Sequence, residues 1–491
     1  MSFTFISAFA ILRLLSRCTC TCTGKEPPTV FYPMLLAGRS TDGAKSVYID
    51  DQLTLNLEKT SVLSEPFTLT EYEGKVPRDS VVDVRDIEDN LYHDPDKLSA
   101  VIMRDQDTGI EMEGIINRTH RIQPSITSAR SADGQLAHEI YCTEEGEHDH
   151  DIGTKLPESR GPPMMSFFSR VESEFQFPSA IYPSIHVVSE YHHSGNLTGV
   201  QLIRYIAIFF ASVNLRYKDL YDPAVRVHVR WVTKLTKGNS DIVSETVRGG
   251  QTYLDDSRTM NRFRQHYRVT RRTENIAFLL TGLDMASFPS YGEWSTNIAG
   301  RAYLGGVCIP GYNTGIAEDT ALSYKGVTTV AHELGHLLGA PHDGDLTTST
   351  CKYSDGYLMG YGNKSVNHYT FSVCSQDTIR AYLKSANRRC VAAMATPVYK
   401  TPIGLPGKNI SLDEYCNLVD AKWTFASLNV DRQSRCNLKC CRTLWNGLAF
   451  ECIAASALDG FTCDDAKGHV CINGICGKEE DLVKPNHPGG A

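Results

Sequence analysis

Three histidines at fixed offsets in the run TVAHELGHLLGAPHDGD, residues 329–345, constrain the fold of this chain more than any other feature. His332 and His336 are four residues apart, so a helix with about 3.6 residues per turn would place both imidazoles on one face. Apolar residues recur at three- and four-residue intervals over residues 321–338, which favours a helix packed on a core. The spacing therefore predicts two side chains that can share one ion.

The residues around this pair predict an open metal site. Gly339 lies where helices commonly end in a left-handed conformation, which would turn the chain so that His342 returns toward the first two histidines. Three neutral imidazoles and a water molecule form the open site of catalytic zinc, whereas structural zinc usually has four protein ligands. Glu333 could accept a proton from that water. The sequence predicts Zn²⁺ held by His332, His336 and His342, with Glu333 as general base.

The full pattern H-E-x-x-H-x-x-G-x-x-H, followed by Met359 in the glycine-rich run SDGYLMGYG, is the metzincin signature of zinc peptidases. With Asp343 directly after the third histidine, it resembles the reprolysin (adamalysin) branch, which includes snake-venom metalloproteases and the ADAM and ADAMTS enzymes. The runs CKYSDGYLMGYG and FSVCSQDTI resemble secreted salivary metalloproteases of ticks. The resemblance covers residues 182–390. It implies that the three histidines bind zinc, that Glu333 is the general base, and that Met359 forms an apolar floor beneath the metal.

Residues 179–396 alternate between strand-like and helical patterns, which predicts a twisted sheet backed by helices. The fold class expected for this region is an α/β metzincin catalytic domain, with a mixed sheet, a zinc helix and a Met-turn. GRAYLGGVCIP, near residues 300–310, resembles the edge strand that accepts the substrate peptide in metzincins. The resemblance also implies two disulfides, Cys308–Cys390 and Cys351–Cys374.

The placement of the sixteen cysteines divides the 491 residues into three regimes and predicts three modules. Residues 1–23 resemble a signal peptide with an uncertain cleavage point. Residues 24–178 carry alternating strand-like runs without a catalytic constellation and resemble a β-rich propeptide. After the domain at 179–396, residues 397–409 form a linker rich in Pro and Gly. Residues 410–491 lack the apolar residues for a core of their own, so we expect a small domain held by about four disulfides.

The sequence of the N-terminal region leaves open how the enzyme would be kept latent and then activated. Cys142 could place a thiolate in the open zinc position as a latency switch, but its context, HEIYCTEE, lacks the glycine of the family's switch pattern. We therefore favour a buried cysteine or one paired near the N-terminus. Arg118 and Arg121 form a minimal R-x-x-R processing motif that overlaps an expected strand and a glycosylation motif.

The composition and the motifs outside the catalytic domain favour a secreted, extracellular protein. Sixteen cysteines and four N-x-S/T motifs, at Asn117, Asn196, Asn363 and Asn409, are typical of an oxidising compartment and mark glycosylation candidates. A net charge of −8 without a basic run argues against nucleic acid as a partner. The sequence has no window of eighteen uninterrupted apolar residues, so it predicts no membrane span.

We therefore predict a secreted zinc endopeptidase that hydrolyses extracellular proteins, of the matrix or fibrin type, by metal-activated water. The alternative is a non-catalytic secreted protein that binds through its cysteine-rich tail, and that tail could equally be an exosite or a passive cap. Tyr361, two residues after Met359, matches a tyrosine that assists the transition state in astacins and serralysins, although a packed aromatic is favoured. The sequence does not indicate an oligomeric state.

Overall fold

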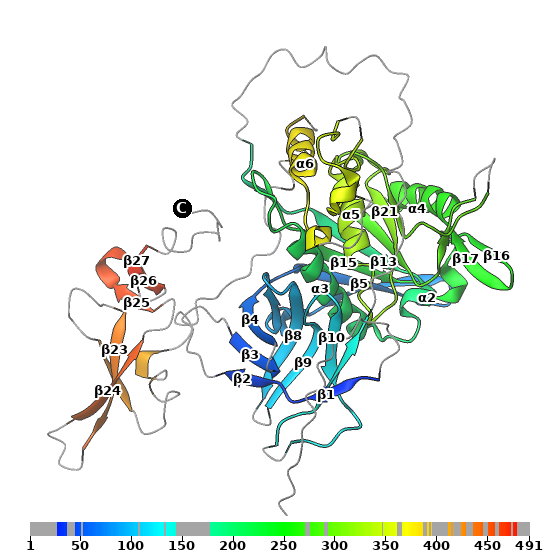
Figure 1. The fold of residues 1–491 in the computed structure, drawn as a ribbon. Coiled ribbons are helices and arrows are strands. Elements are labelled where there is room, and N and C mark those ends of the chain that lie inside the picture. The colour runs from blue at the N-terminus through cyan, green and yellow to red at the C-terminus, as the bar shows by residue number, and fades with distance from the viewer. Residues whose placement is uncertain are drawn as a thin grey trace, which may run out of the picture.

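The computed structural model describes most of the chain between residues 27 and 394 and part of the C-terminal region (Figure 1). The first described part is residues 27–143, except 37–44, 51–52, 107–108 and 132–133. The second is residues 177–394, except 271–274, 289–292, 346, 361–365, 386–389 and 392–393. Beyond these, the structure describes residues 411–413, 416, 424–428, 436–444, 450–456, 461–472 and 475–478.

The N-terminal region forms a nine-stranded sheet in the order β1-β11-β10-β9-β8-β7-β4-β3-β2. Alternating burial along these strands, as in β9 with Ile110 and Met112 inward, builds a core on one face. The strands are Thr29–Phe31 (β1), Met34–Leu36 (β2), Lys45–Asp50 (β3), Leu53–Lys59 (β4), Leu91–Asp94 (β7), Ser99–Gln106 (β8), Gly109–Ile115 (β9), His120–Pro124 (β10) and His138–Cys142 (β11). The expectation of a β-rich N-terminal region agrees with this sheet.

A seven-stranded mixed sheet, in the order β20-β21-β18-β13-β15-β5-β6, forms the centre of the molecule. Strands β21, β18, β13, β15 and β5 are parallel, and the outer strands β20 and β6 run antiparallel to their neighbours. The strands are Leu63–Glu73 (β5), Val76–Val82 (β6), Ser184–Ser189 (β13), His228–Lys234 (β15), Ile276–Thr281 (β18), Gly300–Ala302 (β20) and Thr314–Glu318 (β21). The expected edge strand near residue 300 is therefore an edge of this sheet.

This sheet crosses the domain boundary that we expected at residues 178 and 179. Strands β5 and β6 belong to the N-terminal region, yet β5 pairs in parallel with β15 of the catalytic region. The main apolar core likewise contains residues of both regions, such as Phe67 and Leu69 together with Ile203 and Phe209. Residues 24–178 are thus not a separate folding unit in the structure, because their longest strand completes the central sheet.

Four longer helices surround the metal-site region: Gly199–Arg216 (α3), Asp256–Thr270 (α4), Val327–Leu337 (α5) and Val373–Ser385 (α6). Helix α3 begins with a capping box, in which the Thr198 hydroxyl accepts from the Gln201 N–H and the Gln201 side-chain oxygen accepts from the Thr198 N–H. It is apolar around its circumference, as expected for a helix buried on more than one side. Helix α3 contacts β8 and β9 of one sheet and β15 of the other, and Figure 1 shows it where the two regions meet.

The sequence predicted that the zinc-binding helix would extend over residues 321–338, and its start is wrong. Helix α5 begins at Val327. The preceding loop contains Leu322 with φ of 72° and Tyr324 with φ of 57°, in the left-handed region that non-glycine residues rarely adopt. The apolar periodicity continues through this loop because Tyr324 is itself buried, so pattern alone could not place the helix start.

Shorter elements complete the described N-terminal and catalytic regions. They are Arg85–Glu88 (α1), Tyr191–Ser194 (α2), Ala180–Ile181 (β12), Ala224–Val225 (β14), Glu245–Arg248 (β16), Gln251–Asp255 (β17), Met285–Ala286 (β19), and the 3₁₀ turns Lys237–Asn239, Tyr353–Asp355 and Val366–Tyr369. Strands β16, β17 and β19 form a small separate sheet. No helix among the described residues is long and apolar enough to span a membrane.

The C-terminal region consists of two small antiparallel sheets held by disulfides. The strands are Phe425–Leu428 (β22), Asn437–Thr443 (β23), Phe450–Ser456 (β24), Thr462–Asp464 (β25), His469–Ile472 (β26) and Ile475–Gly477 (β27), with a 3₁₀ turn at Asp465–Lys467. The disulfides are Cys416–Cys440, Cys436–Cys471, Cys441–Cys452 and Cys463–Cys476. Its buried core is mostly half-cystine, in agreement with the expectation that disulfides replace a large apolar core.

Candidate metal centre

Three imidazoles converge at the end of helix α5. His332 and His336 lie one turn apart on the helix, and Gly339, with φ of 97°, reverses the chain so that His342 returns to them. The Nε2 atoms of the three rings are 3.1 Å from one another in every pair. All three side chains are buried. The structure thus brings together the ligand set that the spacing predicted.

Hydrogen bonds at Nδ1 of two rings determine which ring nitrogens are acceptors toward the centre of the three histidines. His332 Nδ1 lies 2.7 Å from the carbonyl oxygen of Leu358, and His336 Nδ1 lies 2.7 Å from that of Ala340. A carbonyl can only accept, so each Nδ1 carries the proton and each Nε2 presents a lone pair. Burial also lowers the pKa of His336 to about 4, which favours the neutral ring. These nitrogens suit a divalent cation such as zinc.

A second group of potential ligands lies in the C-terminal region. Cys436, Cys463 and Cys471 place their sulfur atoms within 4.8 Å of one another. All three are half-cystines of the disulfides given above, so they offer no thiolate. Among the described residues, the three histidines of α5 and the following turn are therefore the set that suits a metal.

Met359 lies beneath the histidines, in the turn that the sequence predicted. Its side chain is fully buried, and its sulfur would lie 2.9 Å from a Cβ placed on Gly335, between the two helical histidines. Two hydrogen bonds connect this turn to the segment that carries the histidines. Leu358 accepts from His332, as described, and the Asp343 N–H donates to the Met359 carbonyl at 2.9 Å. Gly335 is required here because any side chain would displace the sulfur.

Glu333 points from α5 toward the edge strand β20. A Cβ placed on Gly300 would lie 2.8 Å from Glu333 Oε1 and 2.7 Å from Cγ2 of Thr329, one turn earlier on the helix. The carboxyl group is buried, with only 1% of the residue exposed. The acidic side chain next to the histidines thus lies against the backbone of the strand that would receive a substrate peptide.

Substitution of Gly300 tests this close approach. We expect Gly300→Ala to push the Glu333 carboxyl group out of position and to lower kcat on a peptide substrate by up to roughly 100-fold, since ångström-scale displacements of catalytic groups have such effects. Gly238→Ala is the matched control because nothing lies within 4 Å of its added Cβ. Steady-state kinetics of the two variants measure this difference in kcat. Equal kcat values would show that Gly300 does not constrain the position of Glu333.

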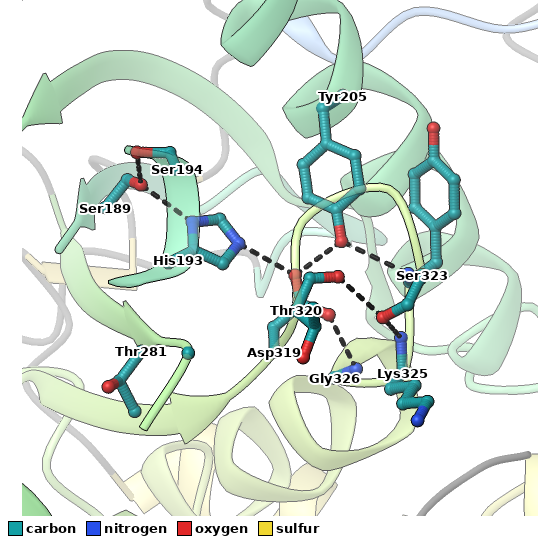
Figure 2. Close-up of polar contacts among 12 residues, drawn as sticks. Ser189, His193, Ser194, Tyr205, Thr281, Asp319, Thr320, Ser323, Lys325 and Gly326 are labelled. Atoms are coloured by element: carbon teal, nitrogen blue, oxygen red, sulfur yellow. Dashed lines mark hydrogen bonds and ion pairs between the residues drawn. The ribbon is translucent and has the colours of Figure 1, made fainter. Parts of the chain in front are cut away.

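A buried polar network fixes the entrance to helix α5, and sequence reasoning did not identify it. Figure 2 shows Asp319, directly after β21, at its centre. Its Oδ1 accepts from the N–H of Gly326 at 2.9 Å, at the start of α5. Its Oδ2 lies 2.8 Å from Nε2 of His193 in α2 and also accepts from the hydroxyl of Tyr205 in α3. One carboxyl group therefore connects α2, α3 and the start of α5, the helix that carries His332 and His336.

The network continues away from the metal. Ser189, at the end of β13, lies with its Oγ 2.7 Å from Nδ1 of His193 and 2.5 Å from Oγ of Ser194. The residues are buried, so this serine, histidine and aspartate triad cannot receive a substrate and is structural. Asp343 has a similar position after the third histidine, where it accepts from Ser372 at 2.6 Å and from Ser375 at 2.8 Å at the start of α6.

Glu318, next to Asp319, carries a perturbed carboxyl group. Burial, together with the nearby Asp284, raises its pKa from 4.5 to about 8. Between these two pH values the native state holds a proton that the unfolded state releases. Stability should therefore fall as the pH rises from about 5 to 8, by up to roughly 1.4 kcal/mol per pH unit.

Glu318→Gln should flatten that part of the pH dependence, because an amide oxygen can still accept from the Met285 N–H, which is 2.5 Å from Glu318 Oε1. Urea unfolding at pH 5, 6, 7 and 8, at one fixed zinc concentration, measures both proteins. The histidines titrate in both, so their contribution cancels in the difference. Parallel stability curves for the two proteins would contradict the raised pKa.

Comparison with known proteins places these residues in a family. Residues 250–394 match the model described as "Reprolysin (M12B) family zinc metalloprotease". This segment, which carries the three histidines, belongs to the reprolysin family. The sequence-based assignment to the reprolysins, and with it to the zinc metalloendopeptidases, is confirmed. The particular resemblance to tick proteins stays a prediction.

The chain is also similar to individual proteins beyond the matched segment. It is 27% identical over 429 residues to "A disintegrin and metalloproteinase with thrombospondin motifs like" of Bombyx mori, covering 82% of this chain and 59% of that protein. It is 25% identical to "Venom metalloproteinase antarease TserMP_A" of Tityus serrulatus, covering 80% of this chain and 99% of that protein. The crystal structure of metalloproteinase-II from Bacteroides fragilis aligns with 72% of this chain and 91% of its own chain. The two are 13% identical, with a TM-score of 0.35.

The remaining predicted sites have mixed outcomes. The structure contains the two expected disulfides, Cys308–Cys390 and Cys351–Cys374. Cys142 is disulfide-bonded, so it has no thiolate for a metal site and the latency-switch alternative is wrong. Arg121 is 2% exposed, which makes an R-x-x-R cleavage site at this position inaccessible in the folded chain.

The glycosylation motifs and Tyr361 are described only in part. Asn196 is exposed in the turn before α3, whereas Asn117 is half-buried and its Oδ1 accepts from the N–H groups of Thr119 and His120, each at 2.9 Å. Both stay candidate glycosylation sites. Tyr361, Asn363 and Asn409 lie outside the described residues, as do the expected signal peptide at 1–23 and the linker at 397–409.

Proposed function

We propose that this chain is a secreted endopeptidase that hydrolyses extracellular proteins, with His332, His336 and His342 holding zinc and Glu333 acting as general base. The observation that carries the proposal is the convergence of three imidazole nitrogens, 3.1 Å apart, next to the buried acidic side chain of Glu333. Without a bound cation, the acceptor nitrogens of His332 and His336 would face each other at 3.1 Å.

The chain's own residues have distinct parts in the reaction. Zinc bound by the three nitrogens would polarise the peptide carbonyl and lower the pKa of a bound water. Glu333 accepts the proton of the attacking water and then donates it to the leaving amine, so no covalent bond to the enzyme forms. Leu358 and Ala340 hold two of the rings through Nδ1, and Met359 closes the site from below.

The edge strand β20 suits an extended peptide as substrate. It pairs on one side with β21, through Gly300↔Ala317, Arg301↔Ile316 and Ala302↔Gly315, and it ends the strand order of the central sheet. A substrate added as a further strand would bind by main-chain hydrogen bonds, which do not select for a particular sequence. Such binding supports a range of protein substrates, and we propose extracellular matrix or fibrin-type proteins.

Secretion is supported by the chemistry of the cysteines. All six disulfides with both partners described lie between Cys308 and Cys476, and such bonds persist in oxidising compartments. The relative from Tityus serrulatus is described as a venom protein, which agrees with an extracellular location.

The decisive test is digestion of a mixed peptide library by the purified chain. We expect cleavage products that disappear when a chelator removes the metal and reappear when stoichiometric Zn²⁺ is added back. Cleavage that continues in metal-free protein would overturn the proposal. A biological effect that survives in Glu333→Ala protein would instead favour the alternative function, binding through the cysteine-rich tail.

A further inference from the structure

Helix α6 is fixed at both ends and along its buried face. The disulfide Cys351–Cys374 anchors the helix near its start, and Cys308–Cys390 anchors the chain that follows its end. Ile379 and Leu383 of this helix are buried in the main core together with residues of α5. Tyr382, next to Leu383, is half-buried and packs against the same core. The helix therefore presents the Tyr382 side chain from a rigid support.

The ring of Tyr382 lies directly against the turn that returns His342 to the other two histidines. A Cβ placed on Gly339 would lie 2.4 Å from Cγ and 2.5 Å from Cβ of Tyr382, far inside van der Waals contact. Gly339 has a φ of 97°, so its backbone already adopts a conformation that favours glycine. The turn therefore has no room to move toward α6, and the tyrosine ring supports it.

The other end of the same side chain contacts the loop that follows the edge strand β20. A Cβ placed on Gly305 would lie 3.0 Å from Cε2 of Tyr382, and the tyrosine hydroxyl donates to the Gly305 carbonyl. The N–H groups of Gly305 and Gly339 both donate to the carbonyl of His336, at 2.7 and 2.9 Å. Tyr382 thus contacts both glycines that are hydrogen-bonded to the last turn of α5.

We propose that Tyr382 is a positioning residue of the peptidase, with a separate role for each end of its side chain. The ring fixes the turn at Gly339, and so it fixes the position of His342 relative to the other two histidines. The hydroxyl fixes the loop at the end of the edge strand β20, along which the substrate peptide would bind. The inference rests on the proposed function, and it assigns to Tyr382 no contact with zinc or with the reacting atoms.

Tyr382→Ala tests the role of the ring. We expect the dissociation constant of zinc to rise by roughly tenfold to a hundredfold, because residues that orient metal ligands have effects of this size. Zinc affinity is measured on the metal-free full-length chain by competition with a chromogenic chelator, after circular dichroism has shown that the variant is folded. Tyr221→Ala is the control, since its ring also contacts α6, with the Arg380 guanidinium 4.8 Å from the ring centre, but the residue is 66% exposed.

Tyr382→Phe tests the role of the hydroxyl, because it keeps the ring against Gly339 and removes only the donor to Gly305. We expect zinc affinity to be retained and KM for an extended peptide substrate to rise by about threefold to tenfold, the usual effect of one hydrogen bond. The value of kcat should change little, since β20 would hold the peptide equally in the ground state and the transition state. Tyr221→Phe should leave both constants unchanged.

A residue that only filled space would give a different result. Both Tyr382 variants would then unfold at a lower temperature, but Tyr382→Ala would bind zinc as tightly as Tyr221→Ala, and this equality would overturn the role of the ring. An unchanged KM in Tyr382→Phe would overturn the role of the hydroxyl. If the alanine variant does not fold, Tyr382→Leu takes its place in the zinc titration. The titration involves no peptide hydrolysis, so a chain with the expected zinc affinities and no peptidase activity would refute the proposed function alone.

Discussion

Glu333→Gln is expected to lower kcat by on the order of 1,000-fold without changing the amount of zinc bound. The amide has the shape of the carboxyl group but cannot accept the proton of the attacking water, and general bases typically contribute 10²–10⁴-fold. The side chain is buried between α5 and β20, where bulk water cannot supply a substitute base. None of the three imidazole nitrogens that we propose as zinc ligands is altered.

Two measurements separate this result from simple misfolding. Zinc content, determined on dialysed protein, should equal that of the original protein, and thermal unfolding should change little. His336→Ala is the comparison variant, because it removes one of the three ligands and should lose both zinc and activity. If Glu333→Gln retained more than about a tenth of the original kcat, a different residue would have to be the base.

The metal site was predictable because its geometry is local. Four-residue spacing within one helix, a glycine at its end and a third histidine shortly after define the position of His332, His336 and His342 almost without reference to the rest of the fold. The edge position of Gly300–Ala302 was also predicted, by family resemblance.

The partnership between the two regions could not be predicted in this way. The alternation of Leu63–Glu73 indicates a strand but does not specify which strand it pairs with, because strand pairing depends on contacts distant in the sequence. The all-round apolar character of α3 was the signal that could have revealed it. A helix of a two-layer domain has a polar face, and α3 has almost none since a second sheet covers it.

The same lesson applies to Asp319, because two of its three hydrogen-bond partners, His193 and Tyr205, lie 126 and 114 residues away in the sequence. Gly326, His193 and Tyr205 all donate to or lie within hydrogen-bonding distance of its carboxyl group. Both oxygens are engaged, and the residue is 2% exposed. Its contribution to stability should therefore be much larger than that of an aspartate on the surface.

Asp319→Ala is expected to destabilise the chain by about 3–5 kcal/mol, because it leaves buried partners without the group that they bond to. For a region of this size that corresponds to a fall in Tm of roughly 10 °C. Asp377→Ala is the control, since the Asp377 carboxylate likewise contacts a neighbouring side chain, that of Arg380 at 2.7 Å, but is 76% exposed. An exposed pair contributes less than about 1 kcal/mol.

Thermal unfolding of both variants at saturating zinc measures the difference. Asp319→Asn should fall between them, because its amide oxygen can still accept from the Gly326 N–H while its NH₂ group faces the hydroxyl of Tyr205. If Asp319→Ala unfolded at the same temperature as Asp377→Ala, the network would not hold the start of α5. In that case the loop with positive φ at Leu322 and Tyr324 would depend on other contacts, of which those from Arg121 and Tyr141 are the next to test.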